Sequence, residues 1–324
     1  MTALETVRSL PQVRRAWPAK DRGLTFEQTD ARGRLRAGAI SADGVARLAE
    51  YASDPALPDL HPGTDAELVV HRLGRRAVLL GDEFASKLLR PGRAAPVAEA
   101  SEQVRELTRG AGVTAARVLG YSSSRVDFQR LPGRSLHALG DAALPGWQRF
   151  VQAWPEVTAR PAELPRHGPA DEARVLTQWL AWAEEHQVLP DLAALRSAVE
   201  HTCRDLTSGD GPSSTIHRDL HDKQLLWDGA NLGLLDCDTA ACGEAALDVA
   251  NLWAHVELRH LQGSLADPSP VLDVLAQLPH DPRRFSAYHR TTRLRLVFVY
   301  AFRPTAARWL PTWVEQTLSL GTAT

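Results

Sequence analysis

The sequence IHRDLHDKQLLW, residues 216–227, together with LGLLDCDTA, residues 232–240, is the most informative part of this chain. The first stretch sets Asp219 and Gln224 on one short polar loop, and the second ends an apolar run at Asp236. Carboxylates this close repel one another unless a cation or hydrogen-bond donors compensate, so their clustering needs a chemical reason. Phosphoryl transfer supplies one, because it uses a carboxylate that accepts a hydroxyl proton and oxygen ligands that hold magnesium on a nucleotide.

Two other interpretations of the loop stay open. In the first, the polar residues merely cap and turn a strand-loop-strand unit. In the second, a zinc-dependent hydrolase uses His217, Asp219 and His221 as metal ligands. Against zinc, Gln224 and Asp236 offer hard oxygen ligands, which suit magnesium better.

The composition of the chain is that of an ordinary globular protein. It has 324 residues, 44% of them hydrophobic, and a net charge of -2. A general nucleic-acid binder would carry a basic surplus, so we expect no nucleic-acid partner. No apolar run is long enough to span a bilayer, and no signal peptide is evident at the N-terminus, so we expect no membrane partner. Cys203, Cys237 and Cys242 fit a reducing interior, which predicts a cytoplasmic protein.

Strand patterns dominate the first part of the chain and helical patterns the second. The expected strands are a hairpin at 24–40, a meander at 68–73, 77–80 and 84–89, and extended segments at 113–120 and 124–130. The expected helices lie near 43–52, at 97–109, then near 141–154, 171–186, 191–206, 246–260 and 282–300, with a last one from about 305. This order predicts an α+β fold with a ligand between a β-rich half and a helical half.

The spacing HxDxxxxQ, followed by an apolar strand and DxD, resembles the catalytic loop and metal-binding aspartate of the protein-kinase-like superfamily. It is most similar to the aminoglycoside phosphotransferase branch, whose loop usually reads HGDLHxxN. The resemblance implies a bilobal fold with a nucleotide cleft between the lobes. The antiparallel β-rich N-lobe would span 1–131, and the mostly helical C-lobe 132–324, with the catalytic loop at 216–227 and the metal-binding segment at 232–240.

The resemblance also implies roles for residues of the catalytic loop and the strand after it. Asp219 would be the catalytic base that accepts the proton of the acceptor hydroxyl. Gln224, where an Asn is usual, and Asp236 would be the metal ligands. His217 would tie the loop to the metal-binding segment, and Asp248 would brace the loop from a helix.

In the N-lobe, the resemblance implies nucleotide-binding roles for four residues. Lys87 on the third meander strand would hold the α- and β-phosphates, and Glu102 on the helix would pair with it, because a partly buried ammonium needs a carboxylate to stay charged. Gln129 and Leu131 would bind adenine through backbone atoms.

Two departures from the family pattern stand out. No glycine-rich phosphate loop is present, and the turn between the first meander strands reads Leu73-Gly74-Arg75-Arg76. Backbone amides or the two arginines would have to meet the phosphates instead. Arg218 replaces a residue that is commonly small in antibiotic kinases.

The resulting expectation is an ATP- and Mg²⁺-dependent O-phosphotransferase that acts on a hydroxyl of an aminoglycoside, a sugar or another natural product, with GTP left open as donor. Asp171, Glu172, Glu184 and Glu185 would attract a polycationic aminoglycoside, or simply form a solvated helix face. The alternative is a catalytically degenerate kinase-like protein that binds nucleotide, suggested by Gln224 and the missing glycine loop.

Overall fold

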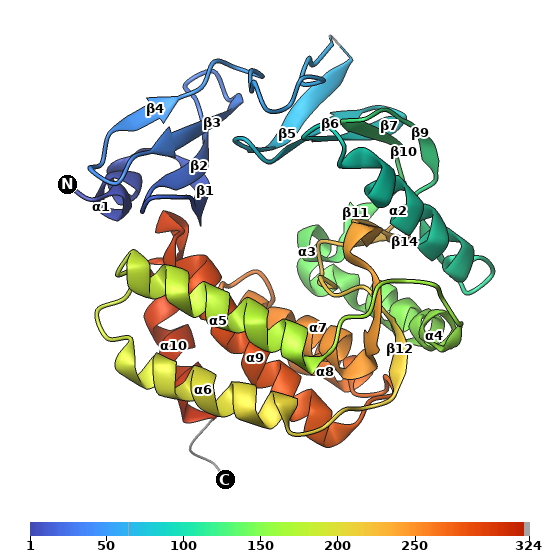
Figure 1. The fold of residues 1–324 in the computed structure, drawn as a ribbon. Coiled ribbons are helices and arrows are strands. Elements are labelled where there is room, and N and C mark those ends of the chain that lie inside the picture. Colours follow the sequence, from blue (N-terminus) through green and yellow to red (C-terminus); the bar gives the residue numbers. More distant parts are fainter. Residues whose placement is uncertain (64, 321–324) are drawn as a thin grey trace.

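The computed structural model describes residues 1–63 and 65–320 (Figure 1). Strands fill most of the chain up to residue 129, and helices most of the chain after residue 136, as the sequence predicts. The α+β class is therefore confirmed.

An antiparallel sheet carries Lys87 in the order β5, β6, β7, β10, β9. Its strands are β5 (Ala66–Arg72), β6 (Arg76–Gly81), β7 (Phe84–Leu89), β9 (Val118–Tyr121) and β10 (Arg125–Gln129). Val78 and Val126 lie directly opposite Lys87 on the two neighbouring strands. The predicted meander is thus confirmed, and it places Lys87 in the middle of the sheet rather than at an edge.

Helix α2 (Ala94–Thr108) covers one face of this sheet, where Ala98 and Val126 pack together. It is the helix predicted at 97–109, and it begins three residues earlier because Pro96 is accommodated in the first turn. A first-turn proline loses no intrahelical hydrogen bond, since its missing N–H would have no partner there.

The N-terminal residues form a second antiparallel sheet in the order β1, β2, β3, β4. Its elements are α1 (Ala3–Ser9), β1 (Val13–Pro18), β2 (Leu24–Thr29), β3 (Leu35–Ile40) and β4 (Ala46–Leu48). The hairpin predicted at 24–40 is confirmed, but the helix predicted near 43–52 is wrong. A turn at Gly44, with φ +85°, reverses the chain after β3, and β4 then pairs with β3 as an exposed edge strand.

The helical half packs around α9, which contacts α5, α6, α7 and α10. Its helices are α3 (Leu136–Leu139), α4 (Leu144–Ala159), α5 (Pro169–Glu185), α6 (Ala193–Thr207), α7 (Ala245–Leu261), α8 (Ser269–Leu275), α9 (Pro282–Ala301) and α10 (Leu310–Ser319). The start of α9 is fixed by Pro282 at its first position and by the Asp281 side chain, which accepts the Arg284 N–H at 2.8 Å. The predicted helices of this half are confirmed, with ends shifted by a few residues.

Two small sheets hold the polar loops. One has the order β11, β13, β14, β8, and the other pairs β12 with β15. Their strands are β8 (Val113–Ala115), β11 (Arg134–Ser135), β12 (Ser213–Ile216), β13 (Leu225–Trp227), β14 (Leu232–Leu234) and β15 (Ala241–Glu244). β8 runs parallel to β14, which connects the strand-rich part to the segment that ends at Asp236.

The N-terminal sheet contacts both halves of the molecule (Figure 1). Phe26 of β2 belongs to the same buried cluster as Phe298 of α9 and Trp313 of α10. On its other side, Leu35 of β3 packs with Leu68 of β5 and other side chains of the meander. Residues 1–48 therefore bridge the meander and the helical half.

Among the described residues, no helix combines the length and the apolar character needed to cross a lipid bilayer.

Candidate active site

The polar loop at residues 217–224 joins β12 to β13, and buried side chains fix its backbone. Asp248 of α7 is 1% exposed, and its two carboxylate oxygens accept the N–H of His217 at 2.7 Å and of Arg218 at 2.9 Å. The His217 ring nitrogen Nε2 lies 2.8 Å from the carbonyl of Leu235, next to Asp236. The expected roles of His217 as a tie and Asp248 as a brace agree with these contacts.

Arg218 has a backbone conformation that favours glycine. Its φ is +72°, in the left-handed region that costs a side-chain-bearing residue about 1–2 kcal/mol. Asp248 holds its N–H, and Asn251 donates to its carbonyl at 2.7 Å, so both peptide groups of the residue are fixed. This geometry gives a physical reason why small residues are common at this position.

The carboxylate of Asp219 has no hydrogen-bond or ion-pair partner in the described part of the protein. It is partly exposed. The neighbouring carboxylate of Asp222, by contrast, is 3% exposed and fully engaged. Asp219 is therefore free to accept a hydrogen bond from a hydroxyl group.

Lys87 meets the segment after β14. Its ammonium nitrogen Nζ lies 2.6 Å from Asp236 Oδ1 and 2.7 Å from Asp238 Oδ2, and the residue is 8% exposed. Asp236 has φ +59°, a left-handed conformation that turns the chain sharply at the end of the strand. Gln224 also reaches this point, since its Nε2 lies 3.4 Å from Asp236 Oδ2. The structure thus brings Lys87 of the N-terminal meander together with Gln224 and Asp236, which lie at the two ends of the β13–β14 hairpin.

The two carboxylates share one cation, and their electrostatics differ accordingly. Burial opposes ionisation of Asp236, but the adjacent Lys87 ammonium holds its pKa well below the usual range. Burial, and then the negative charge of Asp236, raise the pKa of Asp238. Burial alone would lower the pKa of Lys87, yet the two carboxylates raise it. Lys87 therefore stays charged, as a buried ammonium between acids must.

The expected Lys87–Glu102 ion pair is wrong for this structure. Glu102 accepts the Arg105 Nε at 2.7 Å and the backbone N–H of Val118 at 2.7 Å. The side chain thus caps the edge strand β9 and pairs within α2, while Asp236 and Asp238 satisfy the lysine. Asp238, to which the sequence assigned no firm role, is the second partner that the prediction missed, and its DxD spacing from Asp236 was the available signal.

The two residues predicted to contact adenine, on the connection between the two halves, differ in whether their backbone groups are free to bind a ligand. The N–H of Gln129 already donates to the carbonyl of Arg117 at 2.8 Å. Leu131 lies beyond β10, and neither its N–H nor its carbonyl has a hydrogen-bond partner among the described residues. Its side chain is 9% exposed and packs over Gly233 of β14. The structure therefore leaves free backbone groups at Leu131 and not at the Gln129 N–H.

The turn between β5 and β6 is held by an acid that sequence reasoning missed. Asp54 Oδ2 accepts the Gly74 N–H at 2.6 Å and lies 3.2 Å from the His71 ring nitrogen Nε2. Arg76 follows this turn and shares the sheet face of Lys87, because it is two residues from Val78. Arg76 is exposed, and its charge acts on both Lys87 and Asp236.

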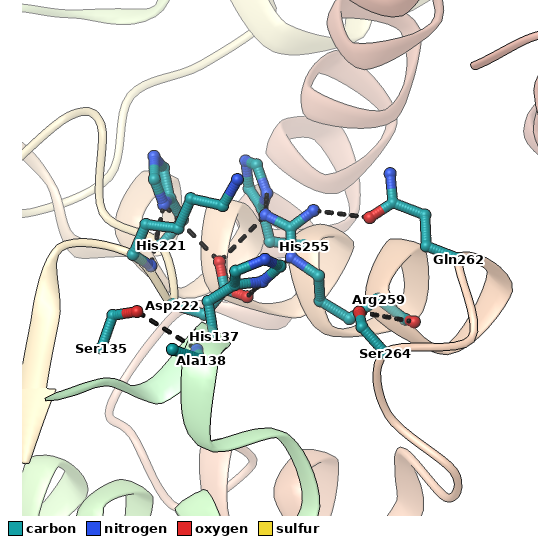
Figure 2. Close-up of polar contacts among 10 residues, drawn as sticks. Ser135, His137, Ala138, His221, Asp222, His255, Arg259, Gln262 and Ser264 are labelled. Carbon is teal, nitrogen blue, oxygen red and sulfur yellow. Dashed lines mark hydrogen bonds and ion pairs between the residues drawn. The ribbon is translucent and has the colours of Figure 1, made fainter. Parts of the chain in front are cut away.

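The histidines of the loop make contacts unlike those of a zinc site, and Figure 2 shows His221 with its neighbours Asp222 and His255. His221 packs against His255 of α7, with ring centroids 4.7 Å apart. Asp222 forms a two-pronged ion pair with Arg259, at 2.6 and 3.0 Å, and also contacts His137 at 2.9 Å. No three His, Cys, Asp or Glu side chains of the described residues lie so that they could hold a metal ion, so the set His217, Asp219 and His221 predicted for a hydrolase does not converge.

The sequence profile of the phosphotransferase enzyme family (APH) matches residues 65–288. No curated protein matches the chain in sequence.

Solved structures resemble the chain in fold. One is a thermostable mutant of aminoglycoside phosphotransferase APH(4)-Ia in the apo form, with a TM-score of 0.60 and 15% identity, covering 81% of this chain and 96% of that chain. A second is the GDP and kanamycin complex of APH(2")-IIia, with a TM-score of 0.54 and 17% identity, covering 82% of this chain and 96% of that chain. A third is a choline/ethanolamine kinase family protein from Mesorhizobium loti, with a TM-score of 0.54 and 13% identity, covering 82% of this chain and 89% of that chain. The kinase-like fold is thereby confirmed, and the chain belongs to the phosphotransferase enzyme family.

Proposed function

We propose that the protein is an ATP- and Mg²⁺-dependent O-phosphotransferase that phosphorylates a hydroxyl of a small molecule. The observation that carries the proposal is the convergence of Lys87, Gln224 and Asp236 beside the loop whose Asp219 side chain has no hydrogen-bond or ion-pair partner among the described residues. A base without a partner beside a cation-binding pair of acids is the arrangement that phosphoryl transfer to an alcohol needs.

The residues present fit a magnesium ion. Asp236 and Asp238 are two carboxylates that already bind a positive charge, the Lys87 ammonium, at 2.6 and 2.7 Å. Gln224 would add an amide oxygen once its side-chain amide turns, since Nε2 now faces Asp236. These are the hard oxygen donors that Mg²⁺ prefers. When bound, the ion would neutralise charge on the nucleotide phosphates.

Lys87 and Asp219 would act on opposite ends of the transfer. The Lys87 ammonium, which now contacts Asp236 and Asp238, would donate to phosphate oxygens of the nucleotide. Arg76, on the same face, would contact phosphates in place of the missing glycine loop. Asp219 would orient the acceptor hydroxyl and take its proton as the new P–O bond forms. Leu131 would hold the base of the nucleotide through its free N–H and carbonyl.

The donor and the location follow from the same proposal. ATP is the donor we assign, and the GDP in one structural neighbour keeps GTP open. A requirement for a nucleoside triphosphate supports a cytoplasmic protein. The free thiols of Cys203, Cys237 and Cys242 support the same location.

A catalytically degenerate nucleotide-binding protein is the second candidate. Gln224 is one methylene longer than the usual asparagine, and its amide nitrogen, not its oxygen, faces Asp236. This candidate predicts binding without turnover.

Mass spectrometry separates the two candidates. The purified protein is incubated with Mg-ATP and a panel of sugars, aminoglycosides, amino alcohols and hydroxy acids, and products heavier by one phosphoryl group are sought. We expect such a product in at least one reaction. A thermal shift with Mg-ATP and no product with any acceptor would support the degenerate protein instead.

A further inference from the structure

A buried amide on α7 holds the peptide group directly before the proposed base. Asn251 is 1% exposed, and its Nδ2 donates to the carbonyl of Arg218 at 2.7 Å. That carbonyl belongs to the planar peptide group that links Arg218 to Asp219. The hydrogen bond therefore fixes the plane from which Asp219 leaves the chain.

The N–H of Arg218 is fixed from the same helix. It donates to Asp248 Oδ1 at 2.9 Å, and Asp248 and Asn251 lie three positions apart, on one face of α7. Arg218 is thus held on both sides in its left-handed conformation, at φ +72°. A residue with a side chain disfavours this conformation, so the loop depends on such contacts to keep it.

The oxygen of the Asn251 amide faces α9, which packs against α7 (Figure 1). Asn251 Oδ1 accepts hydrogen bonds from Thr292 Oγ1 at 2.8 Å and from Arg295 Nη2 at 2.7 Å. Thr292 and Arg295 also lie three positions apart, so one face of α9 presents both donors. A single amide therefore joins α9 to the catalytic loop.

The two donors on α9 differ in what they demand of this amide. A threonine hydroxyl can donate or accept, so Thr292 tolerates either end of the amide. A guanidinium carries donors only, so the amide atom that faces Arg295 must be the oxygen. Arg295 therefore decides that the nitrogen of Asn251, and not its oxygen, points to the Arg218 carbonyl.

Arg295 makes few other contacts. Among residues 1–63 and 65–320, its one hydrogen bond goes to Asn251, and it forms no ion pair. Its Nε is buried and has no hydrogen-bond partner in the same part of the chain. Taking a charged group partly out of water is unfavourable unless it is well paired. The arginine is therefore a poor choice for joining two helices, and what it supplies is the orientation of the amide.

The charge of Arg295 also acts on Glu172 of α5. Burial opposes ionisation of Glu172, but its contact with His167 at 2.6 Å and then the Arg295 charge lower its pKa. This electrostatic role would be lost in any variant that removes the arginine. It stays intact when Asn251 is changed instead, so substitutions at the two positions separate the two roles.

We propose that Arg295 is a positioning residue for the base Asp219. Through Asn251 it fixes the peptide group that precedes Asp219, and with it the direction in which the carboxylate points. The inference rests on the proposed function, because it adds a supporting residue to the same site. Arg295 itself contacts neither nucleotide nor acceptor.

Substitutions on α9 test the demand for a pure donor. In Arg295→Met the Thr292 hydroxyl alone faces the amide, which can then turn either way, and kcat should fall about tenfold, the effect of one lost hydrogen bond. In Thr292→Val the guanidinium still holds the amide, and kcat should stay within about twofold of the wild type. Arg295→Lys restores a group with donors only and should recover most of the lost activity. KM for Mg-ATP should be unchanged in all three variants.

Asn251→Asp removes the bond to the loop and leaves Arg295 and Glu172 in place. The new carboxylate still accepts from Thr292 and Arg295, but an oxygen replaces the nitrogen that faced the Arg218 carbonyl. We expect a Tm close to that of the wild type and a kcat lowered at least about tenfold. A merely structural role predicts instead that kcat follows the Tm.

These kinetic constants are measured with Mg-ATP and the acceptor that the mass-spectrometric screen identifies. An unchanged kcat in Arg295→Met, an equal loss in Thr292→Val, or a fully active Asn251→Asp would each overturn the proposal. If Arg295→Met does not fold, Arg295→Lys and Asn251→Asp take its place, and full activity in Asn251→Asp would still refute the positioning role.

Hydrogen–deuterium exchange tests the positioning role without turnover. The backbone amides of residues 217–220 should exchange several times faster in Arg295→Met and Asn251→Asp than in the wild type, and at the wild-type rate in Thr292→Val. Equal exchange in all four proteins would overturn the proposal. If the exchange differs as expected but no acceptor yields a product, the proposed function fails while the positioning of the loop stands.

Discussion

Lys87 and Asp236 are 149 residues apart in the chain, and their side chains meet at 2.6 Å. One comes from the middle of the N-terminal meander and the other from the end of a C-terminal strand, so this contact joins the two halves of the molecule at the proposed reaction centre. The same ammonium also reaches Asp238 at 2.7 Å. The lysine ammonium therefore binds the same two carboxylates that would bind a divalent cation.

Replacing Lys87 by Met should destabilise the protein by up to about 3 kcal/mol near neutral pH, because it leaves two partly buried carboxylates facing each other. The pKa of Asp236 is lowered in the folded protein, so the stability it contributes is present above its ordinary pKa of about 3.9 and is lost as the pH falls below that value. The deficit of the variant should thus be largest above about pH 4 and shrink below it.

Urea denaturation across this pH range measures the deficit, with the exposed Lys20→Met as control. Millimolar Mg²⁺ should restore part of the stability by placing a cation between the same acids. A deficit that is independent of pH would contradict the assigned ion pair.

Replacing Asp219 by Asn should lower kcat by about 10²–10⁴-fold, because the amide cannot accept the hydroxyl proton. Nucleotide affinity should stay close to that of the wild type, since Asp219 contacts none of Lys87, Asp236 and Gln224. Steady-state kinetics and nucleotide titration measure the two effects. Asp210→Asn, at an exposed site in the loop before β12, is the matched control and should leave both unchanged.

Glu102 and Asp238 offer a contrast that tests which acid serves Lys87. Glu102→Gln should change nucleotide affinity by less than about twofold, because that side chain binds Arg105 and Val118 instead. Asp238→Asn removes a direct partner of Lys87 and should change both the affinity for Mg-nucleotide and the Tm. Isothermal titration of both variants decides the matter, and a larger loss in Glu102→Gln would restore the pairing first expected from the sequence.

Burial raises the pKa of Asp248 to about 6. Because this value exceeds the ordinary value of about 3.9, its contribution to stability is full below pH 4 and is lost as the pH rises through 6, by roughly 3 kcal/mol in all. In the Asp248→Asn variant, the side chain at this position does not ionise. The difference in unfolding free energy between wild type and variant should therefore fall between about pH 4 and 6 and stay level above. A flat difference across that range would show that Asp248 ionises normally.

Glycine should be preferred to alanine at position 218. Arg218 has φ +72°, so Arg218→Gly should be more stable than Arg218→Ala by about 1 kcal/mol. At the exposed helical position Glu200 the order should reverse, because glycine is the weaker helix former there. Thermal denaturation of the four variants tests the pair of predictions, and the same order at both positions would contradict the strained backbone.

Local patterns in the sequence predicted the meander, the position of Lys87 on its third strand and the acid at the end of β14. Each of these depends on a few neighbouring residues, such as the apolar run before Asp236. The partner of Lys87 was harder, because it depends on how α2 is rotated on the sheet, and Glu99, Glu102 and Glu106 are alike in sequence.

Other features had no local signal at all. The three-residue strand β4 is too short for a periodic pattern, and its pairing with β3 decides its conformation. The contact between Asp54 and Gly74 joins positions 20 residues apart, and no sequence pattern links them.

The bridge made by residues 1–48 has a mechanical consequence. A lobe attached to its neighbour by a single connection can rotate in any direction about that point. Here the meander is joined to the helical half at Leu131 and again through the N-terminal sheet, where Leu35 faces β5 and Phe26 faces α9. The halves also meet at the β8–β14 pairing and at the Lys87–Asp236 ion pair, so a rotation of the lobes about the line between these two attachment points would have to open those contacts. Deleting the first 48 residues would remove the second attachment point along with part of the hydrophobic core.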